Sequence, residues 1–462
     1  MISRRDFSKG LAAGLLLPAF SIRAETLPNK PGAWGFGPLQ PDPKRIIDLP
    51  AGFNYRILSV TGQKMADGLA VPGWPDGMHA FALGKGRLSI LCNHELDVSQ
   101  QSMSAWQGDR KATALEKQAS YDMLADQPAP GAVRRIIYDL NKQALVQQHL
   151  ALCGTLRNCS GGATPWNSWI SCEESDRRAG RHKLSQHHGF CFEVPAQGEG
   201  LSRANPLKAM GRFFHESAAV DPATGIVYLT EDRADSLFYR FIPTEQGQLA
   251  KGGRLQALAL ETSGRSVLTG NQGPSDFPSG KRFPVRWLDL DDVESPDDNL
   301  RYQGASAGAA VFVRGEGLAV DVVDIADKQQ TAIWIVASTG GRKGLGQLFR
   351  YFPSKHEGGF RERQAPAELE LFSEPNDARL MRNADNVTVM PNGDILVCED
   401  HHGVQRLIGV TRQGQYYVLA ANPRKASEFT GSTFSPDGST LFVNLQQQGG
   451  TLAITGPWRH AG

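Results

Sequence analysis

The chain places a thiol and two carboxylates, Cys172, Glu173 and Glu174, directly after an apolar and aromatic run that begins at Trp166. Burying unpaired charge is very costly, so a strand that ends in these groups either leaves them in water or gives them to a cation. The same pattern, an apolar run that ends in acids, recurs along the chain. The other three runs end in Asn93-His94-Glu95, Thr230-Glu231-Asp232 and Glu399-Asp400.

Turn sequences indicate that several of these runs are the second arms of hairpins. Each turn combines Pro, which presets φ, with Gly, which accepts a positive φ. Three such turns lie at residues 221–225, 390–394 and 435–438. Because a hairpin returns the chain to the side on which it began, Glu216 is expected near Glu231, and Asp385 near Glu399.

Two further strands have the same shape with uncharged ends, so six similar strand ends are expected to converge. These ends are Asn93, Cys172, Glu231, Thr339, Glu399 and Asn444. The pattern predicts an all-β fold, a six-bladed β-propeller whose inner hairpins present one end to a central channel. A β-sandwich would instead place its strand ends at two distant rims. A polar stretch over 96–127, with helix formers and neither Gly nor Pro over 112–124, predicts a small helical insertion.

A channel mouth lined by so many acids must either protonate them or bind cations, because like charges crowded together repel. Oxygen ligands indicate Ca²⁺ or a ferric ion, and a single thiolate indicates a transition metal at one position. No His-x-x-x-His or Cys-x-x-Cys pair in the sequence supports zinc. The predicted metal ligands are Glu95, Cys172, Glu173, Glu216, Glu231, Glu316, Asp385 and Glu399.

Arg314, two residues before Glu316, is the cation expected to bind an anionic substrate. A guanidinium grips phosphate through two parallel hydrogen bonds. An ion pair between Arg314 and one of the neighbouring acids is an equally good interpretation. The sequence contains no Walker loop, and an oxygen nucleophile held by metal ions is the simpler hypothesis.

The chain has 462 residues and a formal net charge of +1, which gives no reason to expect nucleic acid or an anionic membrane as partner. Residues 3–9, Ser-Arg-Arg-Asp-Phe-Ser-Lys, and the short apolar run after them predict a twin-arginine signal over 1–24. We therefore expect a single domain over 25–462. It would be exported by the twin-arginine machinery to the periplasm or the medium. After cleavage of the signal, the domain would be a monomer that is not attached to a membrane.

Six cysteines in an exported chain raise the question of disulfides. Cys92 and Cys398 sit in apolar strands, where a small buried residue is common, so a core position is favoured for both. Cys153 and Cys159 are close enough in sequence to pair, but their spacing leaves that question open.

Several motifs, in one order over nearly the whole mature chain, resemble the PhoX alkaline phosphatases. They are Asn158 to Trp166, Cys172 to Glu174, His215-Glu216, Thr230 to Asp232, Arg314 to Gly317, Ala384 to Asn386 and Ser435 to Gly438. The resemblance implies a six-bladed propeller with two ferric ions and calcium ions at the channel mouth, which hydrolyses phosphate monoesters. By motif, Cys172 resembles the iron-ligating cysteine, Arg314 resembles the phosphate-gripping arginine, and Glu173, Glu216 and Glu316 resemble metal ligands.

The expected function is therefore that of a metal-dependent phosphomonoesterase acting on small phosphate esters, with Ca²⁺ and Fe³⁺ as cofactors. Arg314, Cys172 and Glu316 are its predicted catalytic residues. One alternative is a phosphodiesterase or a calcium-dependent lactonase on the same fold, and another is a non-enzymatic calcium-binding propeller. A lactonase needs one hard metal and no thiolate ligand, so Cys172 argues against it.

Overall fold

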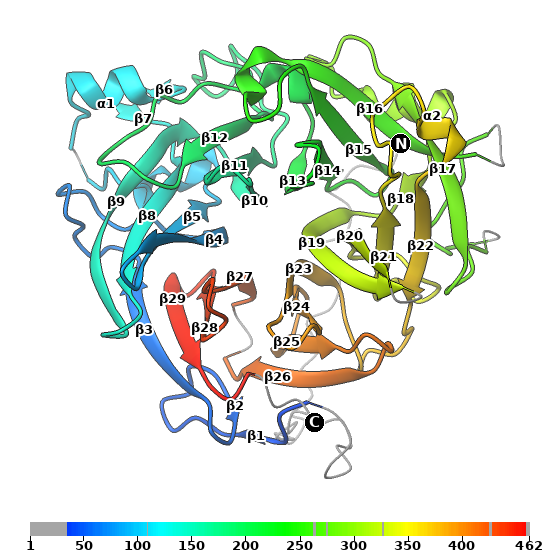
Figure 1. The fold of residues 1–462 in the computed structure, drawn as a ribbon. Helices are drawn as coiled ribbons and strands as arrows, with labels where there is room; N and C mark the ends of the chain where they lie inside the picture. Colours follow the sequence, from blue (N-terminus) through cyan, green and yellow to red (C-terminus); the bar gives the residue numbers. More distant parts are fainter. Residues whose placement is uncertain are drawn as a thin grey trace, which may run out of the picture.

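The computed structural model describes residues 35–108, 110–261, 265–273, 276–325, 328–424 and 427–458. The predicted signal over 1–24 lies outside these residues. Antiparallel strands surround a central axis (Figure 1), so the predicted all-β propeller is confirmed. In the part of the chain that the structure describes, no helix is long and apolar enough to cross a membrane.

In the described residues, six inner strands follow one another around the axis. They are β4 (Pro75–Gly84), β10 (Asn158–Ala163), β13 (His215–Val220), β19 (Gly315–Ile325), β23 (Ala384–Val389) and β27 (Phe429–Phe434). Each inner strand contacts the next one, and β27 contacts β4, so the inner strands form a closed ring.

Each inner strand forms a hairpin with a second strand. These second strands are β5 (Arg87–His94), β11 (Ser168–Glu173), β14 (Val227–Glu231), β20 (Lys328–Ala337), β24 (Ile395–Glu399) and β28 (Thr440–Leu445). The hairpins put apolar, β-branched residues on the sheet faces, as their alternating sequences require.

Outer strands complete the sheets. They are β8 (Gly131–Asp139), β9 (Ala144–Thr155), β12 (Cys191–Pro195), β15 (Ser236–Pro243), β16 (Gly253–Leu260), β17 (Arg282–Asp289), β21 (Gln347–Phe352), β22 (Glu368–Ser373), β25 (Gln405–Val410), β26 (Tyr416–Asn422), β29 (Gly450–Thr455) and β3 (Asn54–Val60). The sheets that begin at β13 and β19 are joined at their outer edges, because β17 pairs with both β16 and β22.

The ring is closed by strands from the two ends of the described chain. β3 pairs with β29, with Val60 opposite Gly450 and Asn54 opposite Thr455. The last sheet therefore combines three strands from the end of the chain with one from its beginning. Hydrogen bonds hold this closure together.

The predicted helical insertion is present between β5 and β8. It contains the helix α1 (Ala114–Ala119), where Thr113 and Glu116 form a capping box. Short elements accompany it, namely η1 (Val98–Met103), β6 (Met123–Leu124) and β7 (Gln127–Pro128). The remaining short elements are β1 (Leu39–Gln40), β2 (Leu49–Pro50), η2 (Lys208–Met210), η3 (Leu249–Lys251), α2 (Leu300–Ser306), β18 (Val311–Phe312) and η4 (Glu362–Gln364).

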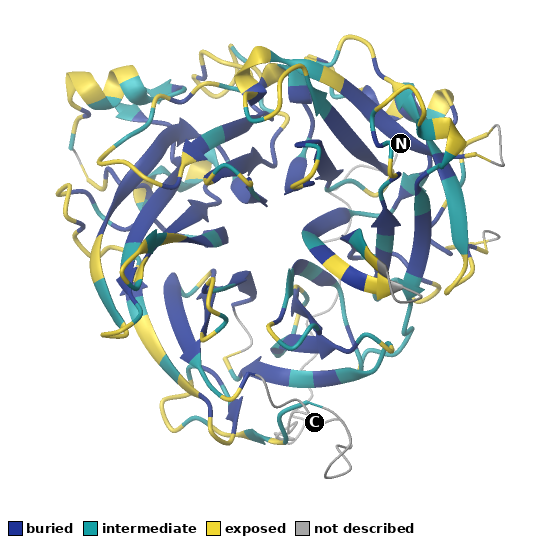
Figure 2. Ribbon diagram, in the orientation of Figure 1, coloured by how far each residue is buried: buried dark blue, intermediate teal, exposed yellow. Residues whose placement is uncertain are grey.

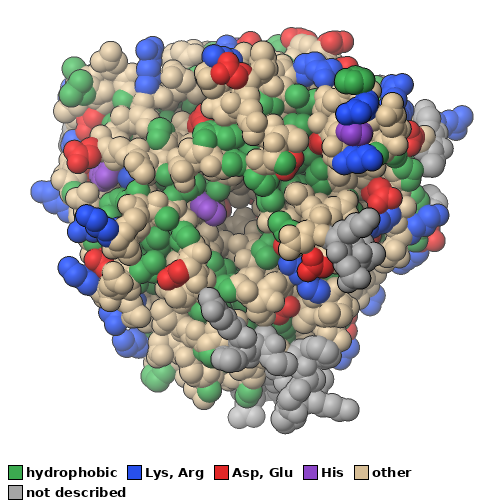
Figure 3. All heavy atoms as spheres, viewed as in Figure 1, with side chains coloured by type: hydrophobic (Ala, Val, Ile, Leu, Met, Phe, Trp, Pro, Cys, Tyr) green, Lys and Arg blue, Asp and Glu red, His purple; other side chains and the backbone are tan. Residues whose placement is uncertain are grey.

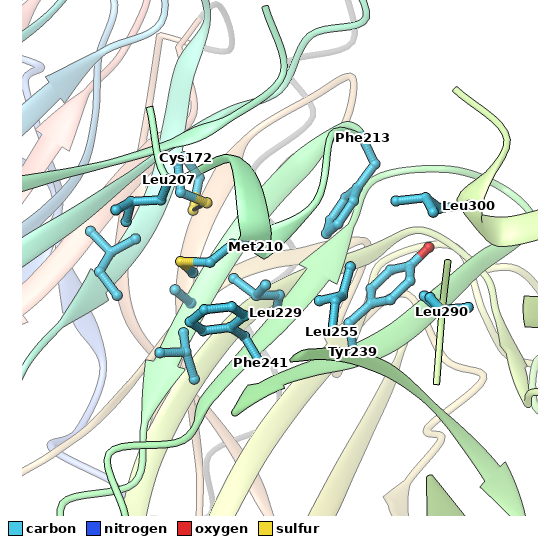
Figure 4. Packing of buried hydrophobic residues seen from close by; sticks show 14 of the residues in the cluster. Cys172, Leu207, Met210, Phe213, Leu229, Tyr239, Phe241, Leu255, Leu290 and Leu300 are labelled. Atoms are coloured by element: carbon cyan, nitrogen blue, oxygen red, sulfur yellow. Dashed lines mark hydrogen bonds between the residues drawn. The ribbon is translucent and has the colours of Figure 1, made fainter. Parts of the chain in front are cut away.

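Apolar clusters between neighbouring sheets hold the ring together. Figure 2 shows that the strands nearest the axis are mostly buried, whereas exposed residues lie in connections and outer edges. One cluster joins the sheet of β11 to the sheet of β14 and includes Ile170, Leu229 and Phe241 (Figure 4). Burying such apolar surface is the main favourable term in folding.

Candidate metal centre

A β-bulge that recurs at the start of the inner strands builds the centre. In the first hairpin Pro75 pairs with His94 and pairing resumes at Met78 with Cys92, so Asp76 and Gly77 face one residue of β5. The same break in register occurs in β10, β13, β19, β23 and β27. A bulge re-aims a side chain, and here it does so around the ring.

The first residue of each bulge supplies the inner donors in five of the six described hairpins. These residues are Asp76, Cys159, Glu216, Glu316 and Asp385. In β27 the same position is Gly431, where an added Cβ would meet the carbonyl oxygen of Asp76 at 2.2 Å. Only glycine fits at that place.

The residue that follows the second strand of a hairpin supplies further polar groups. Glu95 follows β5 and Glu174 follows β11, and both belong to the centre. Ser338, which follows β20, donates a hydrogen bond of 2.7 Å to Oε1 of Glu316. In the last hairpin Gln446 donates to Asp76 at 2.6 Å.

These donors form three overlapping groups in which the ligand atoms lie within 4.8 Å of one another. The groups are Asp76–Glu95–Cys159, Cys159–Glu174–Glu216 and Glu216–Glu316–Asp385. We call the seven residues the acidic cluster. All of them are buried except Asp385, which is half-buried.

The electrostatics of the acidic cluster favour a bound cation. Burial and then the neighbouring carboxylates hold the pKa of Glu216 well above its usual range. Burial and Asp400 raise the pKa of Asp385 to about 8. Oδ1 of Asp76 and Oε1 of Glu216 are buried and have no hydrogen-bond partner among the described residues. Cations would satisfy these oxygens and offset the crowding of like charge, so the donors fit hard metal ions.

Four of the predicted ligands, Glu95, Glu216, Glu316 and Asp385, are brought together in the acidic cluster. Asp76, Cys159 and Glu174 complete it, although none of the three was predicted as a ligand. Asp76 lies in a Pro-Asp-Gly sequence, which is typical of a turn and gives no sign of a ligand.

The structure places the other three predicted acids, Glu173, Glu231 and Glu399, outside the acidic cluster. Glu173 accepts a hydrogen bond of 2.7 Å from the backbone N–H of Gly189. Glu231 accepts one of 2.6 Å from the hydroxyl of Tyr239, and Glu399 binds the guanidinium of Arg406 at 2.6 Å.

In each of these three strands, the acid that acts on the acidic cluster is the residue directly after the predicted one. Each predicted acid is the last residue of its strand, and successive side chains point to opposite faces of a sheet. The residue after each strand, Glu174, Asp232 or Asp400, is the one whose charge acts on the acidic cluster.

Cys172, the predicted thiol ligand, lies outside the acidic cluster. Cys172 lies in the apolar cluster between two sheets, and its Sγ is 3.6 Å from Sγ of Cys191. The thiol among the carboxylates is Cys159, whose Sγ is 3.7 Å from Oδ2 of Asp76. All six cysteines are free, and Cys153 contacts the hydroxyl of Ser120. The paired glycines after Cys159, which indicate close backbone approach, were the available signal.

Two arginines stand at the edge of the acidic cluster. Nε and Nη2 of Arg314 bind Asp232 at 2.6 and 2.8 Å, and Nη2 is 3.0 Å from Oε1 of Glu316. The ion-pair interpretation of Arg314 thus describes the structure. Arg157 is its counterpart, with Nη2 at 2.7 Å from Oε1 of Glu95. Each arginine directly precedes an inner strand with φ near +50°, and each side chain is about one-third exposed.

The channel continues beyond the acidic cluster as a cavity of about 450 Å³. Residues from all six inner strands line it, among them Gly77, Ser160, Ser217, Gly317, Asn386 and Ser432. On the face seen in Figure 3 the centre is hollowed, and charged side chains lie mostly towards the periphery.

The fold and this centre define a class of all-β propeller proteins with a carboxylate-rich, metal-type site on the channel axis. The chain belongs to the PhoX alkaline phosphatase family, whose model, alkaline phosphatase PhoX, matches residues 34–449. The predicted resemblance is confirmed, and the chain is a phosphatase of the phosphoric monoester hydrolase class.

Comparison with solved structures supports the fold through one match. The structure of Pseudomonas fluorescens PhoX in complex with vanadate, a transition state analogue, has 16% sequence identity and a TM-score of 0.62, with 90% of this chain and 97% of that chain covered. The gluconolactonase XC5397 from Xanthomonas campestris has 12% identity and a TM-score of 0.41, with 92% and 98% covered, which is too distant to carry an argument. The sequence has no match among the curated proteins with which it was compared.

Glu173 lies outside the acidic cluster and forms a buried ion-pair group with His188 and Asp122, which we call the clamp. Nδ1 of His188 is 2.7 Å from Glu173 and Nε2 is 3.3 Å from Asp122, which comes from the helical insertion. Burial alone would lower the pKa of His188, but the two carboxylates outweigh it and raise the pKa to about 9. The proton on His188 is therefore bound more tightly in the folded protein.

We expect this clamp to stabilise the fold most below about pH 6.5, and to lose its effect as the pH rises through about 9. The rise in the pKa of His188 from 6.5 to about 9 corresponds to a stabilisation of the folded state by at most about 3 kcal/mol. Urea unfolding of the wild type and His188→Gln at several pH values measures it. A difference in unfolding free energy that does not shrink between about pH 6.5 and about pH 9.5 would contradict a charged His188.

Proposed function

We propose that the chain is an exported phosphomonoesterase that releases inorganic phosphate from small organic phosphate esters at the acidic cluster, with Ca²⁺ and Fe³⁺ as its metal ions. The observation that carries this proposal is the overlap of the three donor groups, two of which share one thiol, with two arginines at the edge. Carboxylate oxygens suit calcium and ferric ions, and one thiolate suits a transition metal.

The residues of the acidic cluster and the two arginines at its edge have different expected roles. Glu95, Glu216, Glu316 and Asp385, with Asp76 and Glu174, supply oxygen donors, and Cys159 supplies a thiolate. Metal ions bound there would neutralise the phosphate and help to orient the attacking and leaving oxygens. Arg157 and Arg314 hold their guanidinium groups beside these donors, where they can bind the free phosphate oxygens and align the ester.

An assay on matched phosphate mono- and diesters, together with metal analysis of the purified protein, tests the proposal. We expect release of phosphate from monoesters, and calcium and iron in the protein. Preferential cleavage of diesters would favour the alternative phosphodiesterase, and a protein without either activity would favour a non-enzymatic calcium-binding propeller.

Arg314→Lys should lower kcat/KM for a phosphate monoester by about 10- to 100-fold, because a charge-assisted hydrogen-bond pair of roughly 1.5–3 kcal/mol is replaced by a point charge. Bound metal should remain unchanged, since Arg314 is not a donor to metal. The matched control is Arg342→Lys, at an exposed arginine that pairs with Asp276 at 2.6 Å. Loss of metal together with activity in Arg314→Lys would instead give Arg314 a structural role in the acidic cluster.

The proposal includes export through the twin-arginine machinery, cleavage of residues 1–24 and a monomeric mature domain over 25–462 in the periplasm or the medium. Its support is the sequence Ser-Arg-Arg-Asp-Phe-Ser-Lys at 3–9. Cell fractionation of a chain with Arg4→Lys and Arg5→Lys tests export, because that chain should stay in the cytoplasm. Export of the doubly substituted chain at the normal level would overturn this part.

A further inference from the structure

A second group of donors lies apart from the acidic cluster, in the apolar cluster between two sheets. Cys172 of β11 faces Cys191 of β12 with their sulfur atoms 3.6 Å apart, and Nδ1 of His215 on β13 is 3.3 Å from Sγ of Cys191. The three donor atoms lie within 4.8 Å of one another, and all three residues are fully buried. Figure 4 shows Cys172 among the apolar side chains of this cluster.

The surroundings of His215 prepare one ring nitrogen as a ligand. Nε2 lies 3.0 Å from the carbonyl oxygen of Gly211, so Nε2–H donates and the lone pair of Nδ1 faces Cys191. Phe213 stacks on the ring at 3.6 Å and fixes its plane. Histidines that bind metal usually donate their other N–H to a carbonyl or carboxylate in this way.

Two of the three donor separations are close to those around a single tetrahedral ion. With zinc–sulfur bonds of about 2.3 Å and zinc–nitrogen bonds of about 2.0 Å, sulfur atoms lie about 3.8 Å apart and sulfur and nitrogen about 3.5 Å apart. The two sulfur atoms are 3.6 Å apart, Sγ of Cys191 is 3.3 Å from Nδ1 of His215, and the donor atoms of Cys172 and His215 lie within 4.8 Å of each other. Two thiolates and a divalent ion carry no net charge, so the complex suits an apolar cluster.

We propose that Cys172, Cys191 and His215 bind one thiophilic divalent ion of the zinc type at a site separate from the acidic cluster. Binding replaces the two thiol protons, which pass to solvent, with two metal–sulfur bonds and one metal–nitrogen bond. Without the ion, the thiols and the imidazole form a chain of hydrogen bonds that ends at Gly211. The ion would tie β11 and β12 of one sheet to β13 of the next.

The donors separate this site from the acidic cluster in metal preference. Two sulfur atoms and one imidazole nitrogen favour soft or borderline ions, whereas carboxylates favour calcium and ferric ions. The ligands come from three strands of two sheets and are far apart in sequence, so no short Cys or His motif marks them. The site concerns stability, and it would exist whether or not the acidic cluster is catalytic.

The test uses the full-length protein with Cys191→Ala, and Cys153→Ala as the matched control. Cys153 is also buried, but its contact is Ser120. After growth with zinc, we expect about one zinc per chain in the wild type and the control, and none in Cys191→Ala. Calcium, iron and activity per folded molecule should be the same in all three. Added zinc should raise Tm in the wild type and the control only.

Cobalt substitution gives a readout that needs no variant, because a cobalt–thiolate site absorbs in the near ultraviolet. A wild type that takes up neither zinc nor cobalt at this site overturns the proposal. Zinc retained by Cys191→Ala overturns it as well. The proposal is also overturned if thiol titration of the unfolded wild type shows that Cys172 and Cys191 form a disulfide. Failure of the phosphatase assay leaves these results untouched.

Discussion

Cys159→Ser will abolish phosphatase activity and remove most of the bound iron. Cys159 is the one thiol among the donors of the acidic cluster, and it belongs to two of the three overlapping groups. A thiol that coordinates a metal ion is deprotonated by it, and serine does not replace such a thiolate. Loss of even an outer-shell partner typically costs roughly 10- to 100-fold, so a loss of more than about 100-fold is expected here. Absorbance, iron content and turnover of the purified proteins measure the effect.

Cys172→Ser is the matched control for Cys159→Ser, because both thiols are buried and both changes keep side-chain size. Cys172 faces Cys191 in the apolar cluster, so its replacement should lower stability and leave activity per folded molecule unchanged. A bleached, inactive Cys172→Ser together with an active, iron-replete Cys159→Ser would restore the sequence-based assignment and refute the one drawn from the structure.

Glu216→Gln should lower activity by more than about 100-fold and reduce bound calcium and iron together. Glu216 belongs to two overlapping donor groups, so it connects the thiol side of the acidic cluster with the Glu316 side. Its Oε1 is buried and accepts no hydrogen bond from the part of the chain that the structure describes. The amide keeps the size of the side chain but removes the negative charge that holds a cation. Metal analysis and turnover are the measurements.

Glu231→Gln is the matched control for Glu216→Gln. Glu231 is fully buried in the hairpin of β13 and β14, but it binds Tyr239 and Arg301 outside the acidic cluster. We expect lower stability with normal metal content and activity. If both amide variants lose metal to the same degree, the division between the two carboxylates is wrong.

The strand ends of the centre could be predicted from sequence, but their last residues could not. Apolar runs that stop at acids mark the hairpins, and the positions expected for Glu216 and Asp385, near the starts of first arms, agree with β13 and β23. Whether the last residue of a strand or the next one faces the axis depends on where pairing stops, and a shift of one residue reverses the side. For this reason Glu173, Glu231 and Glu399 lie outside the acidic cluster, although the sequence predicted them as ligands.

The bulge explains why the thiol of the acidic cluster, Cys159, was not predicted from the sequence. Cys159 sits where an extra residue in β10 turns a side chain out of the normal alternation, and such insertions leave no reliable trace in a hydrophobic pattern. Cys172 sits in regular alternation on β11, where a thiol simply faces the next sheet. The chemistry of the cluster followed from residue types, whereas the choice of thiol required the register.

Because β3 pairs with β29, the ring around the acidic cluster closes only after the strands at both ends of the described chain are present. Contacts between residues far apart in sequence form slowly, because the intervening chain must lose entropy before the contact repays it. Donors of the cluster come from β4 near the beginning of the described chain and from β23 near its end. A growing chain still attached to the ribosome would hold an open, unfinished ring, so the tight uptake of metal ions would report that synthesis and ring closure are complete.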